Sequence, residues 1–270
     1  MNAVALAEPK PGIRWHRVRA VVRRHVLVQF RNPGHWFLLL VLPIVDAVLF
    51  SSIGVAFGET DQAVEILVVG ILLFHVIWQL TLAGSLGFLE EVWSRNVLNL
   101  WTTPLTEGEY GLALLVAGFI RALISMGLVG AVAAGLYAVD PTGAGWVLAV
   151  GAATLMVFGW AVALLVVGLV LQFGEAAEVF SWGTLVLLMP LSGIFYPPEA
   201  LPGVLQPLAQ VVPLTRIFEA TRQSLVDGTV RWADLGLGAA GSLVCVSLGM
   251  WFVRRQLRRF REQGWITRFS

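Results

Sequence analysis

Long runs of apolar residues, separated by short polar connections, make up most of this chain. A helix needs roughly 20 apolar residues to cross the hydrocarbon core of a bilayer, which is about 30 Å thick. Six runs reach or approach that length. We expect spans at Trp36–Phe57, Ile66–Leu89, Gly111–Val139, Trp146–Phe173, Val179–Phe195 and Leu235–Val253. The pattern predicts an all-α integral membrane protein with six transmembrane helices.

The segment before the first span has a different pattern. Arginines recur at helical spacing between residues 14 and 31, with apolar residues between them. This arrangement is typical of an amphipathic helix that lies in the headgroup layer. Asn32-Pro33-Gly34 ends it before the first span. Both a general membrane anchor and a specific docking role fit this interfacial helix.

The connection between the fifth and sixth spans, residues 192–231, is apolar but is interrupted by many Pro and Gly residues. We expect two short helices, at about Glu199–Val211 and Thr215–Val226, separated by Pro213. We expect them to enter the outer leaflet and return as a re-entrant pair. Irregular backbone at that depth needs protein or water around it, so the pair should lie at a packed site or at the mouth of a path.

Composition and charge support this organisation. The 270 residues are 57% hydrophobic and 13% charged, whereas soluble domains carry about 25% charged residues. These values exclude an ordinary soluble enzyme, a disordered chain and a nucleic-acid-binding module. Of the 18 Lys and Arg residues, seven precede the first span and six follow the last.

The positive-inside rule therefore predicts that both termini are cytoplasmic, as in a multi-pass protein of a bacterial-type inner membrane. We divide the chain into a cytoplasmic segment with the interfacial helix (1–35), a six-span domain (36–253) and a basic tail (254–270). Within the domain, the loop 90–110 lies inside and residues 192–231 lie outside.

Several catalytic motifs are absent. The single lysine, Lys10, follows no phosphate-binding glycine frame, so no P-loop is present. The single cysteine, Cys245, allows no internal disulfide, and the four histidines show no metal-ligand spacing. We expect no catalytic residues, no metal site and no cofactor bound by this chain.

Three ionisable residues, Asp46, His75 and Arg121, lie about ten residues into their spans, which is roughly 15 Å deep and near the midplane. A charge there costs at least about 2.5–3.5 kcal/mol. We expect Asp46 to pair with Arg121, either as a structural ion pair or as a polar point in a substrate path. Phe74 and Trp78 add aromatic surface nearby, as packing or as a stacking surface for cargo.

Two segments resemble those of ABC-2 type permeases, the membrane subunits of ATP-binding-cassette exporters. The inner segment, residues 90–106, has an acidic start, a basic residue, an amphipathic turn and a terminal Thr-Pro-Leu. The outer segment carries the residues of the family's signature region: Ser192-Gly193, Phe195-Tyr196-Pro197, Leu201-Pro202, Leu208-Ala209, Pro213-Leu214-Thr215, Glu219 and Arg222.

The resemblance implies that two permeases form a homodimer or pseudodimer and that two separately encoded ABC ATPases bind ATP and Mg. Membrane lipids would surround the spans, and no nucleic-acid partner is expected. The inner loop would be a coupling helix seated in the ATPase. Its expected contact residues are Glu90, Glu91, Arg95, Leu98, Asn99, Trp101, Pro104 and Leu105. The expected outer gate is Phe195, Tyr196, Pro197, Pro213, Glu219 and Arg222.

The spacing of the inner loop is consistent with this role. Leu98, Trp101 and Leu105 fall at i, i+3 and i+7, where they can face one groove. Arg95 and Asn99 lie four residues apart and can add polar contacts, and Arg95 can neutralise an adjacent glutamate. A plain solvated connection is the alternative.

We therefore expect a permease subunit that moves a hydrophobic or amphipathic substrate, drug-like or lipid, outward. Export of a lipid-linked polysaccharide is an alternative. Alternatives of other classes are a lipid-modifying membrane enzyme and a proton-driven transporter.

Overall fold

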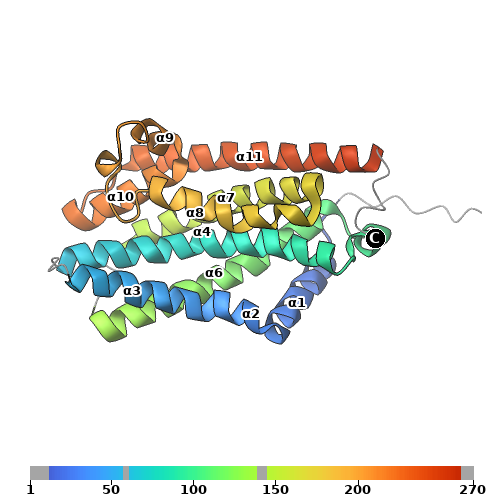
Figure 1. The fold of residues 1–270 in the computed structure, drawn as a ribbon, viewed down its shortest axis with the longest axis horizontal. Coiled ribbons are helices and arrows are strands. Elements are labelled where there is room, and N and C mark those ends of the chain that lie inside the picture. Colours follow the sequence, from blue (N-terminus) through green and yellow to red (C-terminus); the bar gives the residue numbers. More distant parts are fainter. Residues whose placement is uncertain (1–11, 57–60, 139–144, 263–270) are drawn as a thin grey trace, which may run out of the picture.

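The computed structural model describes residues 12–56, 61–138 and 145–262, and every regular element in these ranges is helical. The longer helices form a bundle whose axes run lengthwise in Figure 1. The elements are α1 (Trp15–Arg31), α2 (Pro33–Trp36), α3 (Leu42–Ala56), α4 (Asp61–Trp93), α5 (Val97–Thr102), α6 (Glu107–Tyr137), α7 (Gly145–Phe173), α8 (Glu178–Leu191), α9 (Gln206–Val211), α10 (Pro213–Asp227) and α11 (Trp232–Glu262). A π-helical turn, Phe37–Val41, joins α2 to α3.

Within the described residues, five stretches are long and apolar enough to cross a membrane. They are Pro33–Ala56, Gln62–Trp93, Glu107–Tyr137, Gly145–Leu191 and Trp232–Arg259. The fourth contains both α7 and α8, which are joined by a short 3-10 turn, Gly174–Ala177. The chain reverses direction at this turn. Gly174 has a φ of +72°, a left-handed conformation that favours glycine.

The expected fifth span, 179–195, is therefore shorter than predicted. Helix α8 has 14 residues and ends one residue after Pro190, so it is about 21 Å long at 1.5 Å per residue. It runs back alongside α7 (Figure 1). The other five expected spans correspond to long helices.

Helix α4 forms the centre of the bundle and packs against α3, α6, α7 and α8. Small residues allow its close approach to α7. A Cβ on Gly84 would lie 2.5 Å from the Cβ of Ala163, and one on Gly159 would lie 3.0 Å from the carbonyl oxygen of Ile77. With 33 residues α4 is about 50 Å long, longer than a bilayer core is thick.

Helices α9 and α10 lie at one end of the bundle, and α1 and the C-terminal end of α11 lie at the other (Figure 1). The expected helix 199–211 is shorter than predicted, because α9 begins only at Gln206, after Pro198 and Pro202. The break between the two helices lies at Val212 and Pro213, as expected, and Pro213 occupies the first turn of α10, where its missing N–H costs nothing. The expected helix 215–226 corresponds to α10.

Candidate functional site

The candidate coupling segment, residues 90–109, connects α4 to α6, and the N-terminal helix α1 holds both of its ends. At the α4 end, Arg24 donates two hydrogen bonds to the carboxylate of Glu91, one of 2.8 Å from Nη2 to Oε2. At the α6 end, Nη1 of Arg17 lies 3.3 Å from Oε2 of Glu109 and also donates to the carbonyl oxygen of Pro104. Both carboxylates are buried, so each depends on these partners.

Electrostatics strengthen this contact at the α4 end. The hydrogen bonds to Glu91 raise the pKa of Arg24, so its guanidinium stays charged. The adjacent Glu90 faces two histidines: Oε1 lies 2.8 Å from Nε2 of His35, and Oε2 lies 4.0 Å from Nδ1 of His25. Burial lowers the pKa of His25, although the charge of Glu90 opposes that effect.

At the α6 end, Glu109 completes a capping box. The Thr106 hydroxyl accepts a 3.2 Å hydrogen bond from the Glu109 N–H, and the Glu109 carboxylate accepts one of 2.9 Å from the Thr106 N–H. The backbone N–H of Arg14 donates a further bond of 2.9 Å to the same carboxylate. Thr-x-x-Glu before an apolar run is the sequence signal for this arrangement, and the sequence analysis did not use it.

The turn before α5 differs from the expectation for Arg95. Arg95 has a φ of +53° and is exposed, so it does not neutralise a glutamate. That role falls to Arg24, which lies far away in the sequence. Asn96 helps by donating a 2.7 Å hydrogen bond from Nδ2 to Oε2 of Glu91. Asn99 is exposed and donates to the side chain of Asn96.

Helix α5 lies within the segment where the coupling helix was expected. It comprises six residues and ends at Thr102, before the exposed Pro104 and the half-buried Leu105. The side chains of Leu98 and Trp101 lie outside the described part of the structure, so their common face stays a prediction.

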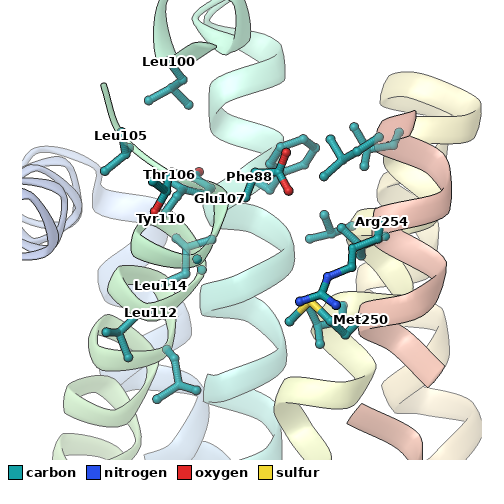
Figure 2. Close-up of a pocket in the computed structure, with 18 of the residues that line it drawn as sticks. Phe88, Leu100, Leu105, Thr106, Glu107, Tyr110, Leu112, Leu114, Met250 and Arg254 are labelled. Atoms are coloured by element: carbon teal, nitrogen blue, oxygen red, sulfur yellow. The ribbon is translucent and has the colours of Figure 1, made fainter. Parts of the chain in front are cut away.

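A groove lies directly behind the coupling segment, between the N-terminal part of α6 and the C-terminal part of α11. We call it the α6–α11 groove. It has a volume of about 390 Å³, and α4 and α7 form its floor. Figure 2 shows Phe88 and Leu114 on one side and Met250 and Arg254 on the other. Leu100 and Leu105 of the coupling segment also line it.

The three intramembrane ionisable residues are not arranged as expected, and the predicted Asp46–Arg121 ion pair is wrong. Oδ2 of Asp46 lies 3.3 Å from Nε2 of His75. Arg121 instead donates hydrogen bonds of 3.2 Å to the side-chain oxygens of Gln79 and Gln29. Arg121 thus joins α6 to α4 and α1, while Asp46 and His75 join α3 to α4.

Aromatic side chains lie near the Asp46–His75 contact. The ring of Trp78 lies 5.9 Å from that of Phe74 and 5.7 Å from that of Trp182 on α8, centroid to centroid. The indole N–H of Trp78 is buried and has no hydrogen-bond partner among the residues that the structure describes. The expected path residues on α3 and α4 thus make two contacts, Asp46 with His75 and Phe74 with Trp78, whereas Arg121 on α6 contacts neither pair. Trp182 is an addition that the sequence did not indicate.

The expected outer-gate residues divide into two groups. Phe195 stacks on Phe50 of α3 with centroids 4.4 Å apart, and the hydroxyl of Tyr196 donates a 3.0 Å hydrogen bond to the carbonyl oxygen of Pro190. Pro197 directly follows this pair, before a 3-10 turn that begins at Pro198.

The second group lies on α10. Arg222 donates to the backbone carbonyl of Gly193, and burial lowers the pKa of its guanidinium. Arg222 thereby ties α10 to the segment after α8. Glu219 faces Arg231 at 3.8 Å, and Pro213 packs against Gly241 of α11, where a Cβ would lie 2.7 Å from the proline ring.

Comparison with known proteins identifies the family. Residues 16–226 match the sequence profile of the ABC-2 type transporter family. The chain is also 25% identical over 221 residues to the daunorubicin resistance ABC transporter permease protein DrrB1 of Streptomyces coeruleorubidus; the match covers 78% of this chain and 74% of that protein. Members of this family are membrane subunits of transporters that normally work with an ABC ATPase, and the similar protein is a permease rather than an enzyme. This chain belongs to the ABC-2 type transporter family, as the residues of its inner and outer segments indicated.

Proposed function

We propose that this chain is the permease subunit of an ABC exporter and that it moves a hydrophobic or amphipathic molecule, drug-like or lipid, outward. Two ABC ATPase subunits bind ATP and Mg and contact the segment 90–109, and a second copy of the permease completes the transporter. The observation that carries this proposal is the contact of α1 with both ends of that segment, through Glu91 and Glu109.

The contacts explain how a movement at the segment reaches the membrane. A displacement of α5 acts on α4 through the hydrogen bond from Asn96 to Glu91, and α1 connects α4 to α6 through Glu91 and Glu109. Helix α4 packs on α3, α7 and α8, so this movement reaches the helices that carry Asp46, His75, Trp78 and Trp182. We infer that these residues line the path and that Phe195 and Tyr196 border its outer mouth.

This function requires a defined orientation. We propose that α1, the coupling segment and the end of α11 lie on the cytoplasmic side of a bacterial-type inner membrane, with α1 in its headgroup layer. Since α1 and the end of α11 lie at the same end of the bundle (Figure 1), the number of crossings must be even. Helix α8, with the irregular segment after it, is then the crossing that brings the five long stretches to six. Helices α9 and α10 are the re-entrant pair on the outer side.

A drug-like cargo is favoured over a lipid-linked polysaccharide by two observations. The similar permease from Streptomyces coeruleorubidus bears a drug-resistance name. The aromatic rings of Phe74, Trp78 and Trp182 form a compact group between α4 and α8. A compact aromatic surface suits a flat amphipathic molecule better than a long hydrophilic chain.

Reconstitution tests the proposal. The permease, copurified with its ABC ATPase into liposomes, should move a fluorescent amphipathic dye in an ATP-dependent manner. Arg95→Glu and Trp101→Ala should retain ATP hydrolysis and folded protein but lose most dye transport. Arg19→Glu, which changes an exposed arginine of α1, is the matched control and should transport normally. Full coupled transport in both coupling variants, or dye transport by the permease without ATPase, would contradict the proposed function.

A further inference from the structure

The α6–α11 groove has the properties of a site for a membrane lipid. Its volume of about 390 Å³ falls within the range of roughly 300–1,000 Å³ that is usual for small-molecule sites. Apolar residues dominate its lining. Phe88, Leu114 and Leu164 are buried in its walls, whereas Glu107 and Arg254 at its rim are exposed. The groove is thus an apolar cleft with a charged mouth.

We propose that this groove binds one anionic phospholipid, with an acyl chain among its apolar residues and the phosphodiester at Arg254. A guanidinium is the side chain best suited to phosphate oxygens, because it presents several N–H groups in a fixed plane. The apolar walls supply the other half of the recognition, since burial of each CH₂ group of a chain is favourable.

The charges around the mouth indicate an anionic ligand. Arg254 lines the groove, and three further arginines that do not line it, Arg255, Arg258 and Arg259, follow on the same and the next turn of α11. Glu107 also lines the groove and offsets part of this charge. The other three arginines give this end of α11 a surplus of positive charge, which attracts anionic headgroups at close range.

Aromatic and basic residues place the mouth at the depth of lipid headgroups. Trp251 is exposed, and the guanidinium of Arg255 lies 5.3 Å from the centroid of its ring. Trp and Arg side chains of this kind concentrate at the membrane–water boundary. The apolar walls then lie at acyl-chain depth, one turn or more toward the centre of the bundle.

The position of the groove gives the bound lipid a second effect. Val97, Leu100 and Leu105 of the coupling segment line the same cavity. An acyl chain in the groove therefore packs against the segment as well as against α11. We infer that the lipid stabilises the coupling segment, an effect that rests on the proposed function, whereas its binding does not.

Two glycines of α6 allow a precise test of binding. Gly111 lines the groove, and a Cβ there would come no closer than 3.8 Å to a neighbouring atom. Gly111→Leu should therefore place an apolar side chain in the groove, since its Cβ meets no atom closer than ordinary van der Waals contact. Gly127 lies on the same helix away from the groove, also with space for a side chain. Gly127→Leu is the matched control, since it has the same effect on helix propensity.

The experiment is native mass spectrometry of the purified full-length chain, delipidated and titrated with phosphatidylglycerol. The wild type and Gly127→Leu should each hold one tight phospholipid, and Gly111→Leu should lose it. Arg254→Gln should weaken binding about tenfold or more, because it removes a charged hydrogen-bond donor from the phosphate. Arg259→Gln, outside the groove, should change binding little.

Three results would overturn this proposal. One is equal phospholipid retention in Gly111→Leu and Gly127→Leu, which would mean that only surface lipid is bound. Another is unchanged affinity in Arg254→Gln. The third is a change in oligomeric state of Gly111→Leu with no loss of lipid, which would make the groove a contact between copies. None of these readouts requires the ATPase, so they are independent of the proposed transport function.

Discussion

Replacement of Arg24 by alanine tests the contact between α1 and the coupling segment. Glu91 has an exposed fraction of 0%, and Arg24 supplies two of its hydrogen bonds, whereas Asn96 supplies a third. Loss of one partner from a fully buried ion pair costs about 3–5 kcal/mol. The side chain of Arg24 is 41% exposed, so water compensates part of that loss, and Asn96 remains. We therefore expect a cost of about 1–3 kcal/mol.

Thermal unfolding in detergent, followed by tryptophan fluorescence, measures this cost. For a chain of this size each kcal/mol corresponds to roughly 2–4 °C in Tm, so Arg24→Ala should lower the midpoint by several degrees. Arg23→Ala removes the adjacent, exposed arginine of the same helix and is the control. Glu91→Gln should cancel much of the loss when combined with Arg24→Ala, because the buried group is then uncharged. Equal midpoints for Arg24→Ala and Arg23→Ala would refute the reasoning.

Three further predictions concern other contacts. Asp46 and Arg121 have separate partners, so the loss of unfolding free energy in the Asp46→Ala/Arg121→Ala double variant should equal the sum of the two single losses within about 0.5 kcal/mol. A difference above about 1 kcal/mol would show that the two residues interact. Because burial lowers the pKa of His25 below its unfolded value near 6.5, the stability due to this residue is present above that pH and decreases as the pH falls toward the folded pKa. His25→Gln should therefore lose less Tm than the wild type between pH 7 and pH 5, and an identical pH profile would contradict this. Thr106→Ala removes the capping hydroxyl of α6 and should cost about 1 kcal/mol in chemical denaturation, whereas an unchanged midpoint would show that the cap is dispensable.

The helices themselves could be predicted from the sequence because apolar length decides them. Five of the six expected spans correspond to long helices. The exception, α8, is short because Gly174 begins a reversal of the chain and Pro190 lies at its end. The sequence showed both residues, but hydropathy alone sets no boundary within a continuous apolar run.

The side-chain partners were less predictable. Depth along a helix follows from residue counting, and it placed Asp46, His75 and Arg121 at similar levels. Rotation about the helix axis does not follow from counting, so it could not show that Asp46 faces His75 rather than Arg121. The contact between Arg24 and Glu91 joins residues 67 apart in sequence, and no local pattern specifies it.

Under the proposed function, the contacts of α1 also determine how the coupling segment meets the ATPase. Glu91 lies near the start of the segment and Glu109 at its end, and both are bound by arginines of one helix, α1. The intervening residues thus form a closed ring held by non-covalent bonds, which removes much of the conformational freedom of an open loop. An ordered ring loses little further entropy when a partner binds. A variant that opens the ring should therefore bind the ATPase more weakly even though every residue that touches the ATPase is unchanged.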